Sequence, residues 1–310
     1  MLGEHEDVGY FMYLTNLYRR APVFGYYSIR AMWAVGILDF AWTPVVHNPR
    51  IPFNNASPYE SELVWSRCSR GQWDEACADV TLDASFSEPR YERYLRSMIR
   101  RHLLALGKPR FMNKNPVNSL RVGFLNRLFP DARFVAASRH PVDTVLSKHR
   151  AAEKLTQRYQ ESPLFQEVLQ ERLRMDMLNL HIKTRTYART LELAKEHPLL
   201  AIANEWVDMQ QAILEARAGD AGIRERTLEV RLHDLQVQPV ETLERLWAFC
   251  QLGGASAQAI TARYADKLGP SPRRPVSDEE RALLPRVWEI VAPVARQMGY
   301  QEPDYDAAYA

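Results

Sequence analysis

The chain has 310 residues, a formal net charge of +2 and 46% hydrophobic residues. This length suits one large α/β domain with an ample core, over 1–310. The nearest candidate for a membrane span, 31–42, is too short and contains Asp39, so no membrane partner is expected. There is no signal peptide, and the three cysteines lie at unpaired-looking positions, which favours a reducing cytoplasm.

The N-terminal part, 1–109, is rich in aromatic residues. Most of them are expected to pack in a core or an interface, and the alternative is that they line an apolar acceptor pocket. The stretch 44–58 holds several Pro and Asn residues, which predicts an irregular loop at the acceptor site.

A central segment, 110–150, has the pattern strand, helix, strand, helix. Residues 110–113 are partly apolar and extended, and they end at Lys114. Asn118 or Ser119 is then placed to cap a helix that runs to Leu128. Lys114 is therefore predicted to lie at a strand end.

The second half of this segment repeats the arrangement. The apolar run 134–137 predicts a buried strand, and Pro141 suits the first position of the following helix. Arg139 then stands between the strand and the helix N-terminus, where α/β proteins favour an anion. Ser147, two turns into that helix, can add a hydroxyl donor.

Positive charge is concentrated in the same region. Two acids stand among 100–150 against eleven basic residues: Arg100, Arg101, Lys108, Arg110, Lys114, Arg121, Arg127, Arg133, Arg139, Lys148 and Arg150. A charge run of this kind can be a solvated face. The strand-end positions of Lys114 and Arg139 favour a phosphorylated ligand instead. Helical patterns follow over 163–217.

These motifs resemble the sulfotransferases that use 3′-phosphoadenosine 5′-phosphosulfate (PAPS), and among them the tyrosylprotein sulfotransferases and their bacterial relatives. The likeness rests on Asn113-Lys114-Asn115-Pro116, on Arg127-Leu128-Phe129-Pro130, and on a serine eight residues after Arg139. The resemblance implies that Arg139 and Ser147 bind the 3′-phosphate and that Lys114 stabilises the sulfuryl group in transfer.

The likeness continues through 229–252 and 290–300. It implies an α/β, P-loop-like three-layer fold with a mostly parallel central sheet flanked by helices, a nucleotide 3′-phosphate-binding core at 110–150, and a helical part at 151–310 with a strand near 228–232. A Pro-rich basic loop, 267–275, corresponds to one that covers the nucleotide in these enzymes. Its candidate contacts are Lys267, Ser271 and Arg273, and a solvated linker is the alternative.

Two departures from the family stand out. The G-x-P-R-S-G-T-T loop that holds the 5′-phosphosulfate is missing, so the first strand and its loop are expected about fifteen residues before Met1. Either Met1 is an internal methionine of a longer product, or the protein has lost the loop. The family's catalytic glutamate corresponds to Met12 or Tyr13; the candidate replacements, none of them selected by spacing, are Asp39, Glu60, Glu62 and His102.

The resemblance therefore predicts an enzyme that transfers a sulfuryl group from PAPS to a hydroxyl or amine of a small-molecule or peptide acceptor, releasing PAP. No metal and no nucleic-acid partner are expected. The alternative is a non-catalytic member of the fold that binds PAP or a protein. A nucleotide kinase is disfavoured because G-x-x-x-x-G-K-[ST] does not occur in the sequence.

Overall fold

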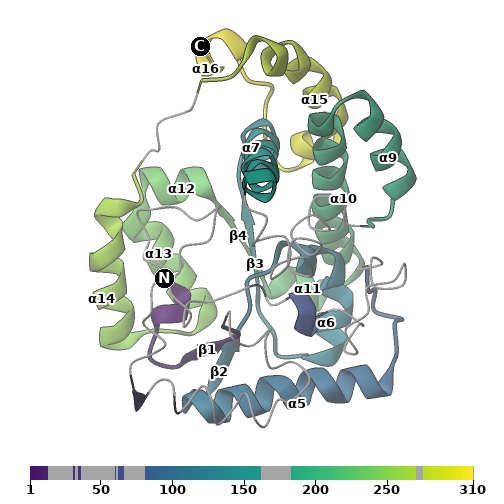
Figure 1. Cartoon of the computed structure of the whole chain (residues 1–310). Coiled ribbons are helices and arrows are strands. Elements are labelled where there is room, and N and C mark those ends of the chain that lie inside the picture. The colour runs from purple at the N-terminus through teal and green to yellow at the C-terminus, as the bar shows by residue number, and fades with distance from the viewer. Residues whose placement is uncertain are drawn as a thin grey trace. The chain divides into compact units, whose positions relative to one another are not determined.

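The computed structural model of the chain describes residues 1–12, 31, 34–35, 60, 62–65, 81–161, 183–269 and 275–309. The chain divides into two compact units, and each is described by itself. The first is made of Met1–Ala78, Leu82–Arg133 and Gln238–Leu268, and the second of Asp79–Thr81, Phe134–Val237 and Gly269–Ala310. Figure 1 labels their helices and strands.

In its described residues, the first unit contains two strands and mostly short helices. Its described elements are η1 (Leu2–Glu4), β1 (Val8–Tyr10), α3 (Glu62–Trp65), α5 (Pro89–Leu106), β2 (Arg110–Met112), η3 (Pro116–Arg121), α6 (Val122–Leu128), α13 (Pro239–Cys250), α14 (Gly254–Tyr264) and η4 (Ala265–Lys267).

The two strands of this unit, β1 and β2, pair in parallel. Val8 is opposite Arg110 and Tyr10 is opposite Met112, so the carboxyl ends of both strands lie at the same edge. Helix α5 leads into β2 and ends at Gly107, whose φ of 62° is a left-handed conformation that favours glycine. Its buried face consists of Tyr91, Leu95, Met98, Ile99 and His102. This packing positions β2 and the residues that follow it.

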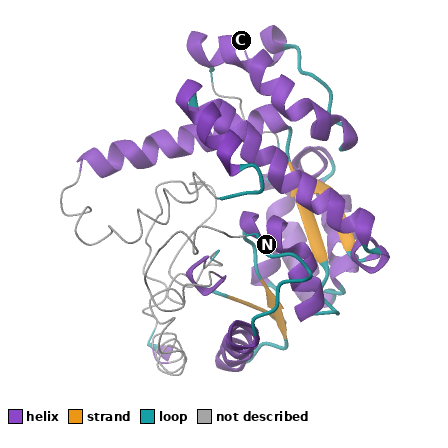
Figure 2. Ribbon diagram, turned by 90° about the vertical axis from the view of Figure 1, so that its right-hand side faces the viewer, coloured by secondary structure: helices purple, strands orange, loops and turns teal. Residues whose placement is uncertain are grey.

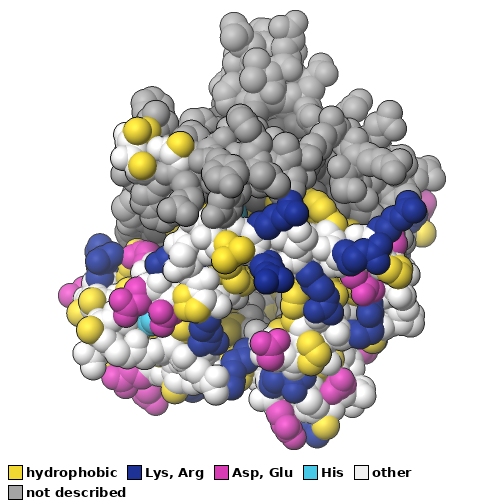
Figure 3. Space-filling view, turned by 90° about the horizontal axis from the view of Figure 1, so that it is seen from below, with side chains coloured by type: hydrophobic (Ala, Val, Ile, Leu, Met, Phe, Trp, Pro, Cys, Tyr) yellow, Lys and Arg dark blue, Asp and Glu magenta, His cyan; other side chains and the backbone are white. Residues whose placement is uncertain are grey.

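Helix α5 has a strongly basic outward face. It lies at the bottom of Figure 1, and Figure 3 shows Lys and Arg side chains gathered on the face seen from below. The exposed basic residues of this helix are Arg90, Arg93, Arg96, Arg100 and Arg101. Two members of the basic run, Arg100 and Arg101, therefore lie on a solvated helix face.

After β2 the chain turns into a 3-10 helix, η3, and then into α6. Asn115 caps this turn, because its side chain accepts a hydrogen bond from the backbone N–H of Val117 at 2.9 Å. The sequence predicts the helix cap at Asn118 or Ser119, and this prediction is wrong. Pro116 occupies the first position of η3, which suits its fixed φ, and the helical turn therefore begins earlier than predicted.

The second unit is built around a parallel strand pair and long helices. Its described elements are β3 (Phe134–Ser138), α7 (Pro141–Glu161), α9 (Tyr187–Glu196), α10 (Pro198–Gly219), α11 (Ala221–Glu225), β4 (Thr227–Arg231), α12 (Leu232–Val237), α15 (Asp278–Gln297) and α16 (Tyr305–Tyr309). Strands β3 and β4 lie side by side in Figures 1 and 2, with Phe134 opposite Thr227 and Ser138 opposite Arg231.

The hydrophobic core of the second unit lies among α7, α10 and α15. Val142, Val145, Leu199, Val287 and Val291 are fully buried there. Helix α10 is buried along most of its first three turns, and α15 covers it through a long apolar face. The N-terminal half of α7 is thus fixed by packing, which sets the direction of the side chains on its other face.

The α/β class with parallel strands is confirmed. The strands predicted at 110–113, 134–137 and 228–232 are present as β2, β3 and β4. Among the described residues the strands form two separate parallel pairs rather than one sheet, because β2 pairs with β1 while β3 pairs with β4. β1 is not predicted, since three residues are too few to show an alternating pattern. The loop at 44–58, most of the N-terminal aromatic residues and the helical pattern over 164–182 lie outside the described residues.

Candidate active site

Lys114 lies where the sequence predicts, two residues beyond the end of β2. The side chain of Lys114 is 71% exposed, and its ammonium group forms an ion pair with the carboxylate of Glu60. The parallel pairing of β1 and β2 brings two strand ends to this edge, which is where α/β proteins place ligands. We call this pair of side chains, Lys114 and Glu60, the lysine–glutamate pair.

Glu60 is held at this edge by its neighbours on both sides. Two residues further on, α3 begins, and its Val64 and Trp65 are buried in the first unit. On the other side, Asn113 Nδ2 donates a hydrogen bond to the backbone carbonyl of Glu60 at 3.3 Å.

The amide of Asn113 is itself oriented by a second amide. Asn118 Nδ2 donates to Asn113 Oδ1 at 2.8 Å. This bond leaves Asn113 Nδ2 directed at Glu60. Four residues are candidates to replace the family's catalytic glutamate. Among the described residues, Glu60 is the candidate that lies beside Lys114.

His102, another of those replacements, belongs to the fold. Its ring is buried on the inner face of α5, its Nε2 lies within hydrogen-bond distance of the Tyr10 carbonyl oxygen, and its ring lies 5.4 Å from that of Phe11. Burial lowers the pKa of His102 to about 4, although the hydrogen bond to Tyr10 acts in the opposite direction. A base committed to a backbone carbonyl in this way is poorly placed to take an acceptor proton. Asp39 lies outside the described residues, and Glu62 begins α3.

Arg139 lies between the end of β3 and the start of α7, as predicted. Its side chain is 41% exposed, and its Nε lies 3.6 Å from Asp143 Oδ2, one turn into the helix. Asp143 also accepts a hydrogen bond from the Tyr309 hydroxyl at 2.9 Å. The helix N-terminus and the guanidinium together present positive potential, and Asp143 partly offsets it.

Ser147 follows Asp143 by four residues on α7 and is exposed. Positions 139, 143 and 147 are spaced by four, so they lie on one side of the N-terminal part of α7. The buried residues Val142, Val145 and Leu146 occupy the opposite side. Arg139 and Ser147 therefore face solvent along a common line, with the Asp143 carboxylate between them.

The C-terminal segment packs on the carboxyl ends of β3 and β4. Ser138 Oγ and Tyr300 Oη lie 2.8 Å apart, and Arg231 lies over the Tyr300 ring and donates to the Met298 carbonyl at 2.5 Å. Gly299 has a φ of 78°, and a Cβ there would lie 2.9 Å from Arg231 Nη2. Only glycine fits this turn, which explains the Met298-Gly299-Tyr300 sequence.

His140 joins the same cluster through its ring. It stacks on Trp288, with ring centroids 5.9 Å apart and an interplanar angle of 11°. Its Nε2 lies 3.0 Å from the Gln301 carbonyl oxygen. These contacts fix the backbone on both sides of Arg139. No pattern in the sequence identifies Arg231 or Trp288 as residues that make them.

The Pro-rich basic loop contributes one described candidate. Lys267 ends η4, is exposed, and lies over the ring of Tyr264 at 5.5 Å from the ring centroid. Ser271 and Arg273 lie outside the described residues. The loop's nucleotide contacts therefore stay a prediction, and so does its alternative as a solvated linker.

Much of the basic run contacts the protein itself. Lys148 pairs with the buried carboxylate of Glu205 at 2.5 Å, and Arg127 pairs with Glu92 at 2.6 Å. Arg133 and Arg110 donate to backbone carbonyls of the first unit at 2.7 and 2.8 Å. These cations stabilise the fold, and the strand-end residues Lys114 and Arg139 carry the ligand hypothesis.

In the part of the chain that the structure describes, no group of three or more His, Cys, Asp or Glu side chains is arranged to hold a metal ion. In the same residues, every helix is too short or too polar to cross a membrane.

Comparisons with known proteins agree with this geometry. The model of the sulfotransferase family matches residues 47–198, a range that includes Glu60, Lys114, Arg139 and Ser147. The crystal structure of sulfotransferase STF9 from Mycobacterium avium superposes with a TM-score of 0.55 and 14% sequence identity, covering 97% of this chain and 72% of that one. A search of curated proteins gave no match.

The family match over residues 47–198 and the shared fold support an assignment to the sulfotransferase superfamily. Sulfuryl transfer is the chemistry of this class, and the chain accordingly has the fold of a transferase. The closer likeness to tyrosylprotein sulfotransferases and the missing 5′-phosphosulfate loop stay predictions.

Proposed function

We propose that the chain is a PAPS-dependent sulfotransferase that transfers a sulfuryl group to a hydroxyl or amine of a small-molecule or peptide acceptor. The observation that carries the proposal is the position of two partly exposed cations, Lys114 and Arg139, one or two residues after the end of a parallel strand within a sulfotransferase fold. A donor with anionic groups at both ends is the ligand that such positions attract.

The 3′-phosphate end of the donor is assigned to α7. Arg139 offers a planar fork of N–H donors that suits phosphate, and the exposed Ser147 hydroxyl adds a donor on the same side of the helix. The positive end of the helix dipole supports an anion beside Arg139. These groups act on binding of the nucleotide, so their loss should weaken the affinity for PAP.

Lys114 is assigned to the reacting end. In sulfuryl transfer, as in phosphoryl transfer, negative charge develops on the oxygen that leaves, and a fixed cation lowers the barrier by stabilising it. The side chain of Lys114 is exposed and lies two residues beyond the end of β2, so its ammonium group can reach a donor at this edge. The reaction then needs no metal from the protein.

The test of this proposal is calorimetry with PAP on the full chain. We expect wild-type protein to bind PAP, Arg139→Ala to bind it about 10- to 150-fold more weakly, and Ser147→Ala to lose less, because hydrogen bonds to charged groups contribute about 1.5–3 kcal/mol when the donor is also charged. Arg185→Ala is the control, since Arg185 is an exposed arginine of the same unit that pairs with Glu215 at 2.7 Å. No PAP binding by the wild type, or equal affinity in Arg139→Ala, contradicts the assignment.

A further inference from the structure

The lysine–glutamate pair places a carboxylate at the same strand edge as the proposed sulfuryl-stabilising cation. The two residues stand 54 positions apart in the chain, and their contact comes from packing. Glu60 is fixed through its own backbone carbonyl by Asn113, the residue next to Lys114. Its side chain remains 33% exposed, so it is reachable by a molecule that approaches from solvent.

The glutamate of the resembling enzymes corresponds to Met12 or Tyr13, and Tyr13 lies outside the described residues. Met12 is fully buried, as is Phe11 before it. The apolar, enclosed side chain of Met12 neither accepts a proton nor reaches an acceptor. Within the part of the chain that the structure describes, the carboxylate in contact with Lys114 is that of Glu60.

We propose that Glu60 is the general base of the sulfuryl transfer, an inference that rests on the proposed function. The Glu60 carboxylate takes the proton from the acceptor O–H or N–H as the acceptor atom bonds to sulfur. The bond between sulfur and the bridging oxygen breaks, and its electron pair stays on that oxygen as PAP leaves. Lys114 donates a hydrogen bond to this oxygen, so the pair serves both ends of one in-line displacement.

The carboxylate is suited to this role by its geometry. One oxygen, Oε1, accepts a hydrogen bond from Lys114, which orients the carboxylate, and the second oxygen is present to accept the proton. An exposed ion pair contributes little to stability, so the pair can be changed without unfolding the protein. A catalytic role therefore predicts a large effect on turnover from a substitution that has a small effect on folding.

The experiment compares wild type with Glu60→Gln, which keeps the shape and a hydrogen bond to Lys114 but cannot take a proton. Radiolabelled PAPS is the donor, and the acceptors are water and a panel of phenols, amines, carbohydrates and peptides. General-base catalysis contributes about 10²–10⁴ in rate, so we expect kcat to fall by that factor while PAP affinity is unchanged. Glu92→Gln is the control, because Glu92 is a carboxylate of the same unit paired with an arginine at 2.6 Å.

The dependence on the acceptor separates a base from a merely structural residue. The substitution should reduce the rate least with a phenol that is already ionised at the assay pH, since no proton then needs removal. Equal kcat in wild type and Glu60→Gln, or equal losses for ionised and un-ionised acceptors, overturns the inference.

The two proposals fail in different ways. If the wild type transfers sulfuryl groups and Glu60→Gln is equally active, Glu60 is not the base and the proposed function stands. If the wild type binds PAP yet consumes no PAPS with any of these acceptors, both the transferase and its base are refuted.

Discussion

Asp143 controls how much of the Arg139 charge is offered to a ligand. Its carboxylate lies 3.6 Å from Arg139 Nε and also accepts from the Tyr309 hydroxyl. It stands between Arg139 and Ser147 on the line where the 3′-phosphate is proposed to bind. A negative charge at this point disfavours a second anion. Asp143 therefore limits the affinity for the 3′-phosphate while it orients Arg139.

This arrangement predicts that Asp143→Asn binds PAP more tightly. An asparagine retains an acceptor for Tyr309 but removes the charge of a carboxylate whose arginine partner is 41% exposed. Ion pairs with solvent-exposed arginines are worth about 0.2–1 kcal/mol, which corresponds to a gain of up to about fivefold. The measurement is calorimetry at low and high salt, and the gain should shrink in high salt. Glu192→Gln removes one carboxylate of an exposed pair elsewhere in the unit and serves as the control. Weaker binding in Asp143→Asn would show that the Asp143–Arg139 pair holds the guanidinium in its binding position.

Local sequence patterns predict some residues of the candidate site but not the contacts between them. Lys114, Arg139 and Ser147 are predicted from local patterns, because strand ends and helix starts leave short sequence signals. The contact of Glu60 with Lys114 and that of Arg139 with Asp143 are not predicted. The Glu60–Lys114 contact depends on the packing of α3 and on the hydrogen-bonded amides of Asn113 and Asn118. The Arg139–Asp143 contact depends on the rotamer of the arginine, and a spacing of four residues permits this contact without fixing it.

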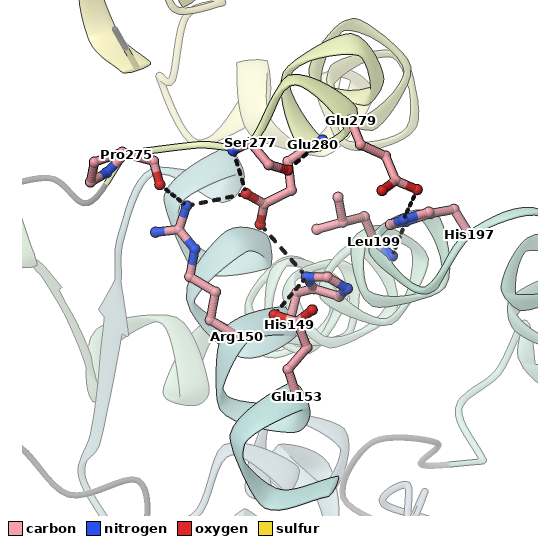
Figure 4. Close-up of polar contacts among 9 residues, drawn as sticks. All are labelled: His149, Arg150, Glu153, His197, Leu199, Pro275, Ser277, Glu279 and Glu280. Atoms are coloured by element: carbon pink, nitrogen blue, oxygen red, sulfur yellow. Dashed lines mark hydrogen bonds and ion pairs between the residues drawn. The ribbon is translucent and has the colours of Figure 1, made fainter. Parts of the chain in front are cut away.

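At the scale of elements, α7 is anchored both at its start, beside Arg139, and near its middle, at His149 and Arg150. Figure 4 shows Arg150 and His149 of α7 directed at Glu280, in the first turn of α15. Arg150 Nη2 lies 3.5 Å from Glu280 Oε2 and donates to the Pro275 carbonyl at 2.9 Å. Glu280 Oε1 also lies 3.7 Å from His149 Nδ1.

Glu280 completes a capping box at the start of α15. Ser277 Oγ accepts from the Glu280 N–H, and the Glu280 carboxylate accepts from the Ser277 N–H at 2.9 Å. Burial alone would raise the pKa of Glu280, but the Ser277 hydrogen bond and the nearby Arg150 outweigh it and lower the pKa below its ordinary value of 4.5. The ionised form is therefore the one that the folded protein stabilises.

A carboxyl group whose pKa is lower in the folded state stabilises the protein above its unfolded pKa. The stability it adds is lost as pH falls through the folded value. We therefore expect Glu280→Gln to lower the free energy of unfolding at pH 7, and the difference from wild type to shrink steadily below about pH 4.5. Chemical denaturation at a series of pH values measures this, with Glu289→Gln as the control on the same helix. A difference that is constant from pH 7 to pH 3 would contradict the role given to the charge.

The elements themselves were largely readable from the sequence. The strands at 110–112 and 134–138 and the helix that starts at Pro141 follow from apolar runs bounded by proline and polar residues. The cap at Asn115 was misplaced, because three Asn and Ser residues compete within five positions and only the backbone geometry chooses among them. The strand β1 was missed because its three residues carry too short a pattern.

At the scale of the whole molecule, the resemblance to sulfotransferases and the α/β class follow from motifs in the central segment. The partition of the strands into two pairs does not follow, because pairing between distant segments is decided by packing and leaves little trace in local sequence. The proposed function rests on Lys114 and Arg139, and for these two residues the predicted position after a strand agrees with the structure.

The most direct measurement of the central claim is transfer of radiolabelled sulfuryl from PAPS by the full chain, compared with Lys114→Ala. If Lys114 stabilises the leaving oxygen, its removal should lower kcat by about 10²–10³, equivalent to about 2.7–4 kcal/mol, while leaving PAP affinity nearly intact. Lys195→Ala is the matched control, because that side chain is equally exposed, at 71%, and pairs with a carboxylate. The account predicts transfer by wild type and Lys195→Ala and its near loss in Lys114→Ala; equal transfer by all three proteins would contradict it.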